Sequence, residues 1–269
     1  MILDFHYHYA DVPGFIDDLL RQMDEAEVDM TLLTTGPEDM YWEFKNCTVK
    51  KNEDTLKAVK EHPDRIIGSV YIDPRKPDAI ETYERFAEAG FRAVKMFPPV
   101  GFYPDEERFF PLYEKIAQYG MPILFHIGQT NIKYIQKPGE PRRAMSSKYG
   151  HPMNIDMLTR LFPEIPFVIA HMGYPFYTES WSVAHANPNV YLDIAGSGPW
   201  TMGIPTVYNA LGGASYIPID FKRVIWGSDN CIEQKESIAY AKVYLKHMGC
   251  KSEERKLVLG DTAKHLLKI

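Results

Sequence analysis

Cysteine is scarce in this sequence of 269 residues. Its three cysteines, Cys47, Cys231 and Cys250, are an odd number and have no Cys-x-x-Cys spacing. This excludes a disulfide framework and a cysteine-based zinc knuckle, and it indicates a reducing compartment such as the cytoplasm.

Long apolar runs and an excess of basic charge are missing too. No apolar run approaches the roughly 20 residues that span a bilayer, and no charged segment leads from Met1 into an apolar one. The 30 lysines and arginines stand against 36 acidic residues, so the net charge is −6. We therefore expect a protein that stays in the cytoplasm and binds neither membranes nor nucleic acid.

What the chain does have is a regular alternation of strand-like and helix-like segments along its whole length. The predicted strands are 2–8, 30–34, 66–72, 91–97, 122–127, 167–171, 190–194 and 224–226. The predicted helices include 14–26, 54–61, 78–89, 110–119, 155–162 and 232–247. Eight units of about 34 residues each predict an α/β protein with a single (β/α)8 barrel, or TIM barrel, over residues 1–269.

An open, doubly wound sheet is the alternative fold. Such a sheet normally has a glycine-rich phosphate turn after its first strand, whereas residues 9–13 read Tyr-Ala-Asp-Val-Pro. Two connections, 128–154 and 196–222, are far longer than the about two to six residues of ordinary loops in α/β units. In a barrel they would lie over the carboxyl ends of the strands, where active sites are built.

Histidines gather at the ends of the predicted strands. His6 and His8 are two residues apart, so strand alternation places both imidazoles on one face. His126 and His171 end two further strands, and Asp229 follows the last one. A surface pair of histidines would explain His6 and His8 alone equally well, but the repeated position favours a site for one divalent metal, with zinc, manganese and iron as candidates.

The ordered motifs resemble the amidohydrolase superfamily, in its amidohydrolase-related branch. They are His6-x-His8, 90–96 (Gly-Phe-Arg-Ala-Val-Lys-Met), 125–128 (Phe-His-Ile-Gly), 170–173 (Ala-His-Met-Gly) and 227–229 (Gly-Ser-Asp). Thr262 departs from the pattern, because the closing helix of the family usually carries asparagine before the alanine.

The resemblance implies one divalent metal held by His6, His8, His126 and Asp229, with His171 as a general acid/base or electrostatic partner. It also implies a homo-oligomer, and either hydrolysis of C–N or lactone C–O bonds or removal of carbon dioxide from an acid. The chemistry is consistent with these residues. A metal can lower the pKa of bound water from about 15.7 to near 7, Asp229 can accept its proton, and His171 can orient the substrate or protonate the leaving group.

Other polar residues have two interpretations. Lys95, near the end of its strand, either supplies positive charge to the barrel mouth, where we predict that it binds the substrate, or becomes carboxylated as in two-metal members of the superfamily; we favour the first. Asp4 shares the inward face with His6 by alternation, so it either supports a ligand or makes a structural hydrogen bond. We predict that Cys231 is a bystander and that His151 and His185 are not ligands.

Substrate contacts are predicted in the long loops. Arg142, Arg143 and Lys148 lie close together, and arginine is the usual partner of a carboxylate, so they bind an acidic substrate or face solvent. An aromatic pocket is predicted from Trp181 together with Tyr7, Tyr9, Tyr174 and Trp200.

The sequence thus predicts a metal-dependent hydrolase that uses a metal-activated water on an amide, lactone or related ester of a small molecule, with a carboxylated molecule as one option. A non-oxidative decarboxylase of an aromatic or muconate-type acid uses the same ligands. A non-catalytic metal-binding barrel and a metal-free hydrolase are the remaining alternatives.

Overall fold

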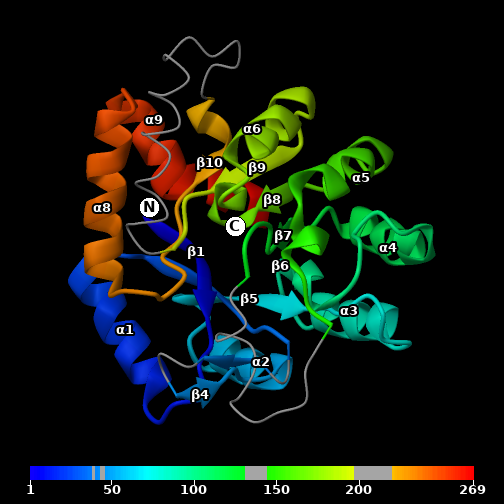
Figure 1. Ribbon diagram of the computed structural model, residues 1–269. Coiled ribbons are helices and arrows are strands. Elements are labelled where there is room, and N and C mark those ends of the chain that lie inside the picture. Colours follow the sequence, from blue (N-terminus) through cyan, green and yellow to red (C-terminus); the bar gives the residue numbers. More distant parts are fainter. Residues whose placement is uncertain (38–39, 43–45, 131–143, 197–219) are drawn as a thin grey trace.

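The computed structural model describes all residues except 38–39, 43–45, 131–143 and 197–219. Eight parallel strands form one sheet in the order β1-β2-β5-β6-β7-β8-β9-β10. The backbone N–H of Phe5 donates a hydrogen bond of 3.2 Å to the oxygen of Trp226, which joins the first strand to the last. The sheet therefore curls into the predicted TIM barrel (Figure 1).

All eight predicted strands are confirmed, with ends that differ by up to two residues. They are β1 Leu3–His8, β2 Met30–Thr34, β5 Ile66–Tyr71, β6 Ala93–Met96, β7 Ile123–Phe125, β8 Phe167–Ile169, β9 Val190–Asp193 and β10 Val224–Ile225. The sequence did not reveal a small antiparallel hairpin formed by β3 (Tyr41–Trp42) and β4 (Cys47–Thr48).

Helices surround the strands (Figure 1). The six predicted ones are confirmed as α1 Phe15–Ala26, α2 Asn52–Glu61, α3 Ala79–Glu88, α4 Phe110–Tyr119, α5 Asp156–Leu161 and α8 Gln234–His247. Three more are α6 Tyr177–Ala186, α9 Ser252–Lys256 and α10 Thr262–Leu267. Helix α6 escaped prediction because its apolar residues do not form one stripe. Within the described ranges, no helix is both long and apolar enough to cross a membrane.

The barrel interior is apolar at one end and polar at the other. Inward-facing side chains of the strands form a buried cluster with the closing helix α10: Leu3, Phe5, Leu32, Ile67, Ala93, Leu124, Val168, Ala170, Ile225, Ala263, Leu266 and Leu267. Two residues further along their strands, the same face carries Thr34, Ser69, Lys95, His126 and Asp193, all buried. The fold thus collects polar side chains at the carboxyl ends of the strands.

Strand β1 departs from this alternation. Its pairing with β2 is irregular between Asp4 and Tyr7. Leu3 and Phe5 face the barrel interior, and His6, the next residue along the chain, also points toward the interior and contacts Lys95. The prediction that Asp4 shares the face of His6 is therefore wrong.

The Asp4 carboxylate instead makes a structural hydrogen-bond network. It accepts hydrogen bonds from the backbone N–H of His6 (3.1 Å), from the N–H and hydroxyl of Ser228 (2.9 and 2.6 Å) and from Nε2 of Gln234 on α8 (2.9 Å). Burial raises the pKa of Asp4 to about 6, although these hydrogen bonds oppose the rise. Asp4 thereby ties β1 to the segment after β10.

We predict that Gly227→Ala destabilises the protein by about 1–3 kcal/mol, because an added methyl group at this close contact forces the backbone of a neighbouring strand to shift. A β-carbon there would lie 2.6 Å from Cβ and 2.9 Å from the backbone nitrogen of His6, which cannot move without shifting β1. Chemical denaturation measures the loss. Gly249→Ala is the control for steric overlap, because nothing lies within 4 Å of the new carbon. Only the positive φ of 77° opposes this substitution, so we expect it to lower the free energy of unfolding by about 1–2 kcal/mol and to leave the metal content unchanged. Unaltered stability of Gly227→Ala would contradict the close packing of β1 and β10.

Candidate metal centre

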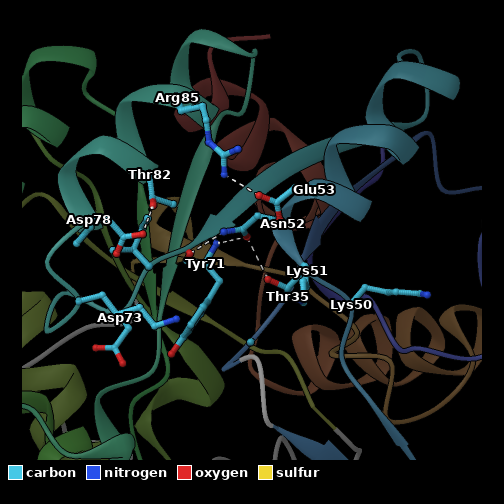
Figure 2. Close-up of a pocket in the computed structure, with 14 residues that line it drawn as sticks. Thr35, Lys50, Lys51, Asn52, Glu53, Tyr71, Asp73, Asp78, Thr82 and Arg85 are labelled. Carbon is cyan, nitrogen blue, oxygen red and sulfur yellow. Dashed lines mark hydrogen bonds and ion pairs between the residues drawn. The ribbon is translucent and has the colours of Figure 1, made fainter.

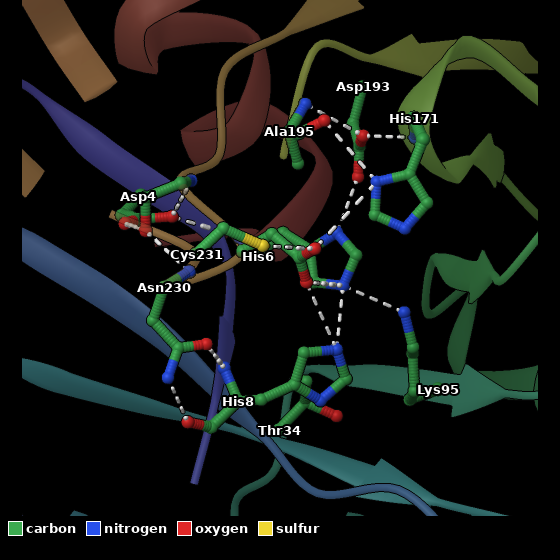
Figure 3. Close-up of polar contacts among 12 residues, drawn as sticks. Asp4, His6, His8, Thr34, Lys95, His171, Asp193, Ala195, Asn230 and Cys231 are labelled. Atoms are coloured by element: carbon green, nitrogen blue, oxygen red, sulfur yellow. Dashed lines mark hydrogen bonds and ion pairs between the residues drawn. The ribbon is translucent and has the colours of Figure 1, made fainter. Parts of the chain in front are cut away.

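Figure 3 shows His6 and His8 close together on strand β1. Asp229 lies with them at the carboxyl end of the barrel. The Nε2 atoms of His6 and His8 are 3.1 Å apart, and Oδ1 of Asp229 lies 3.4 Å and 3.3 Å from them. Ligands bound to zinc at about 2.0–2.2 Å in a tetrahedral arrangement are about 3.4 Å apart. Two imidazoles and a carboxylate at this spacing fit a divalent transition metal.

Hydrogen bonding determines which nitrogen of His6 faces the centre. Nδ1 of His6 lies 2.8 Å from Oδ2 of Asp193, and a carboxylate only accepts hydrogen bonds, so Nδ1 carries the proton. Burial, with a contribution from Lys95, lowers the pKa of His6 to about 3 and keeps the ring neutral. Nε2 therefore presents a lone pair toward His8 and Asp229.

Asp193, at the end of β9, organises this region. Its Oδ1 accepts hydrogen bonds from the backbone N–H groups of His171 (2.7 Å) and Ala195 (3.0 Å), while its Oδ2 binds His6. Burial raises the pKa of Asp193, but His6 and His171 outweigh it and the pKa is lowered. The sequence analysis missed Asp193. It selected Asp229 because this carboxylate follows a predicted strand, and the same criterion would have found Asp193 at the end of β9.

His171 lies beside the centre on an unusual backbone. His171 and Met172 follow β8 with φ of 56° and 49°, in the left-handed region that costs a non-glycine residue about 1–2 kcal/mol. Nδ1 of His171 donates to the backbone oxygen of Ala195 at 3.3 Å, and its ring centroid is 5.2 Å from that of His6. The hydrogen bond from the His171 N–H to Asp193 helps to hold this turn.

Asp229 and Asn230 also have positive φ, 57° and 37°. The N–H of Asp229 donates to the oxygen of His6 at 2.7 Å. The side chain of Asn230 accepts from the N–H of His8 at 3.1 Å and donates to its oxygen at 3.0 Å. These bonds hold the turn after β10 against the strand that carries both histidines.

The two oxygens of Asp229 face different neighbours. Oδ1 faces His6 and His8, whereas Oδ2 lies 4.0 Å from Nδ1 of His171 and 3.4 Å from Sγ of Cys231. Cys231, predicted to be a bystander, is thus in contact with a candidate ligand. Burial alone would raise the pKa of Asp229, but the neighbouring histidines hold it well below its usual range, so the carboxylate is ionised.

His126 is buried at the end of β7, next to the centre. Its Nε2 lies 3.0 Å from Oγ1 of Thr130, and its ring stacks on Phe97 with centroids 4.3 Å apart. In the part of the chain that the structure describes, the possible ligand atoms form two groups, His6 with His8 and Asp229 and His6 with His171 and Asp193. His126 belongs to neither, so its role as a ligand stays a prediction.

Lys95 enters the same space from β6. It is fully buried, and its Nζ lies 2.8 Å from Nε2 of His6. Burial lowers the pKa of Lys95 to about 8, although Asp229 and Asp193 oppose the fall. The predicted positive charge is therefore placed beside the candidate metal ligands.

The other predicted substrate contacts are not assembled with the centre. Arg142, Arg143 and Trp200 lie outside the described residues. Trp181 is half-buried on α6 and packs against a second cluster of buried apolar residues, distinct from the one that includes α10. Lys148 is exposed, with its Nζ over the ring of Tyr149. Their roles stay predictions.

A parallel eight-stranded barrel with buried histidines and a carboxylate at its carboxyl end defines a TIM-barrel protein with a candidate metal centre. The family model described as Amidohydrolase matches residues 3–269, so the chain belongs to the amidohydrolase family. This confirms the resemblance seen in the motifs. No curated protein matches the chain.

Solved structures show the same fold. An uncharacterised TIM-barrel protein from Bordetella bronchiseptica is 19% identical with a TM-score of 0.73, and the alignment covers 99% of this chain and 98% of that one. A probable 2-pyrone-4,6-dicarboxylic acid hydrolase from Acinetobacter baumannii, with citric acid bound, is 13% identical with a TM-score of 0.66, and the alignment covers 100% of this chain and 99% of that one. A dihydroxybenzoic acid decarboxylase from Polaromonas sp. JS666, with manganese and 2-nitroresorcinol bound, is 15% identical with a TM-score of 0.65, and the alignment covers 99% of this chain and 96% of that one.

We predict that replacing His6 and His8 by alanine abolishes metal binding, because it removes two of the three clustered donor atoms. Elemental analysis of the purified parent should find about one equivalent of metal, and the folded variant should have almost none. Circular dichroism checks the fold. His185→Ala, on the exposed side of α6, is the matched control and should keep the metal. Full metal content in the double variant would place the site elsewhere.

A second prediction concerns Asp193→Asn. The amide nitrogen would donate to Nδ1 of His6 and move the ring proton to Nε2, which then no longer presents a lone pair. We expect metal affinity to fall by about 10–100-fold, measured by competition with a chelator. Asp24→Asn, an exposed change on α1, should leave affinity unaltered. Parent-like affinity of Asp193→Asn would rule out this control of the His6 proton.

Proposed function

We propose that the protein is a metal-dependent hydrolase that cleaves an amide, lactone or related ester bond of a small molecule. His6, His8 and Asp229 would hold one divalent ion, with His126 as a further candidate ligand. Zinc suits two imidazoles and a carboxylate best, and manganese or iron are the alternatives. Residence in the cytoplasm and assembly into a homo-oligomer stay predictions.

The observation that carries this proposal is that the two oxygens of Asp229 have different neighbours. Oδ1 lies with the two histidine nitrogens, and Oδ2 faces His171 and remains available to accept a proton. The carboxylate is ionised, as a general base must be. A divalent ion bound there would polarise a substrate carbonyl and make a water molecule more acidic.

The remaining residues of the centre orient and transfer protons. Asp193 keeps the proton of His6 on Nδ1, so that Nε2 stays a donor atom for the ion. His171 is fixed through its backbone N–H and its Nδ1, which directs its other nitrogen away from Ala195. From this position it can orient the substrate or protonate the leaving group.

A decarboxylase is the second candidate, supported by the likeness to the dihydroxybenzoic acid decarboxylase. In that reaction a positioned acid, here His171, would protonate the carbon that loses carbon dioxide. A non-catalytic metal-binding barrel is the third candidate, and the charged, hydrogen-bonded centre argues against it.

Product analysis decides between these reactions. We expect the metal-loaded protein, screened against lactones, amides and aromatic acids, to take labelled oxygen from water into a product. Release of carbon dioxide instead would overturn the hydrolase in favour of the decarboxylase. No turnover of any compound, with or without metal, would favour the binding barrel.

Asp229→Asn tests the role of the carboxylate. The amide can still offer an oxygen to the ion but is a poor base, so we expect kcat to fall by roughly 10²–10⁴-fold with metal still bound. Asp220→Asn, at an exposed site before β10, is the control and should retain activity. Unchanged kcat in Asp229→Asn would exclude it as the base.

A further inference from the structure

Among the described residues, Lys95 is a buried cation that contacts no carboxylate directly, although Asp229 and Asp193 act on it from further away. Its side chain is fully buried, and it follows by two residues Ala93, which belongs to the inner apolar cluster. Among the residues that the structure describes, no carboxylate oxygen lies within 4.0 Å of its Nζ, and its one polar contact is Nε2 of His6 at 2.8 Å. A buried charge costs several kcal/mol unless an opposite charge compensates it.

Two cations that line a cavity in the outer wall of the barrel are paired with carboxylates. A cavity of about 150 Å³ opens between α2, α3 and the ends of β2 and β5 (Figure 2). On its walls Arg85 contacts Glu53 at 2.6 Å, and Lys50 contacts Asp11 at 2.6 Å. These cations are more exposed than Lys95 and need a partner less. Lys95 has no such direct carboxylate contact within the described residues, so a bound molecule has room to supply one.

The contact with His6 cannot serve as that partner in the working enzyme. A lone pair on Nε2 of His6 that binds a metal ion is no longer available to the ammonium group. The ammonium and the ion would then be two positive charges facing one space. An anion between them would interact favourably with both.

Ser69 points to the same conclusion independently. Its Oγ is buried and has no hydrogen-bond partner in the described part of the chain. It follows by two residues Ile67, which belongs to the inner cluster, and its Cα pairs with that of Ala93 on the neighbouring strand. The hydroxyl therefore faces the barrel interior on the strand beside Lys95. Buried hydroxyls usually have a partner, so a ligand is the natural acceptor here.

We propose that Lys95 anchors a carboxylate group of the substrate, with Ser69 as a second donor to it. The substrate is then a carboxylic acid whose reacting carbonyl lies on the side of Asp229 and His171. This inference rests on the proposed function, since it takes the barrel mouth as the substrate site. It assigns recognition of the acid to the interior of the barrel in addition to the loop arginines that the sequence suggested.

Ligand binding to Lys95→Met tests the anchor, because methionine keeps the shape and removes the charge. The ligands are benzoate and fumarate and their neutral amides, titrated into the metal-loaded protein by calorimetry. We expect the parent to bind an acid at least 10-fold more tightly than its amide, and Lys95→Met to bind the acid roughly 30-fold more weakly than the parent, with metal content unchanged. Ser69→Ala should weaken acid binding by about 3–10-fold.

Lys57→Met, an exposed change on α2, is the matched control and should bind both acids like the parent. Equal binding of acid and amide by the parent, failure of both acids to bind, or parent-like acid binding by Lys95→Met would each overturn the proposal. Loss of metal from Lys95→Met would also overturn it, because Lys95 would then belong to the metal centre itself.

The two proposals can fail separately. If the parent takes up no metal, the proposed metallohydrolase fails, and the same titration of the metal-free protein still decides the anchor. Acid binding that disappears in Lys95→Met would support the anchor in that case. Metal uptake and hydrolysis of a neutral substrate, without preference for acids, would leave the proposed function intact and reject the anchor.

Discussion

The centre depends on the hydrogen bonds that the carboxylate of Asp193 accepts. This carboxylate joins the ends of three strands, because Oδ2 binds His6 of β1 while Oδ1 accepts from His171 after β8 and from Ala195 after β9. One buried charge thereby sets the proton of His6 and helps to hold the left-handed turn at His171. A side chain without two acceptor oxygens there could not accept hydrogen bonds from both His6 and the His171 backbone.

The barrel supplies the setting for this carboxylate. Alternation along the strands fills one end of the interior with apolar side chains and brings polar ones to the other end. The irregularity in β1 is the exception that brings His6 toward the site while Asp4 points to α8. Burial then lowers the pKa values of His6 and Lys95. Burial alone would raise the pKa of Asp229, but the neighbouring histidines hold it low, so the carboxylate is ionised.

Much of the fold was predictable because strand and helix periodicity is local. The eight strands and most outer helices follow from apolar spacing, whereas α6 has no single apolar stripe and β3 and β4 are only two residues each. His6, His8 and Asp229 were found because they end strands. Asp193 ends a strand too and was overlooked, and the orientation of Asp4 was wrong because a break in alternation leaves no local signal.

By itself the sequence determined the barrel, its family and the residue types at the strand ends, because these depend on periodicity and on motifs read along the chain. Only the tertiary structure decided which nitrogen of His6 faces the centre and which oxygen of Asp229 lies with the histidines. It also decided that Lys95 is buried and that no carboxylate of the described residues contacts it directly. Those facts depend on distances between side chains from different strands. No spacing along the chain encodes them, because the packing of the whole barrel determines them.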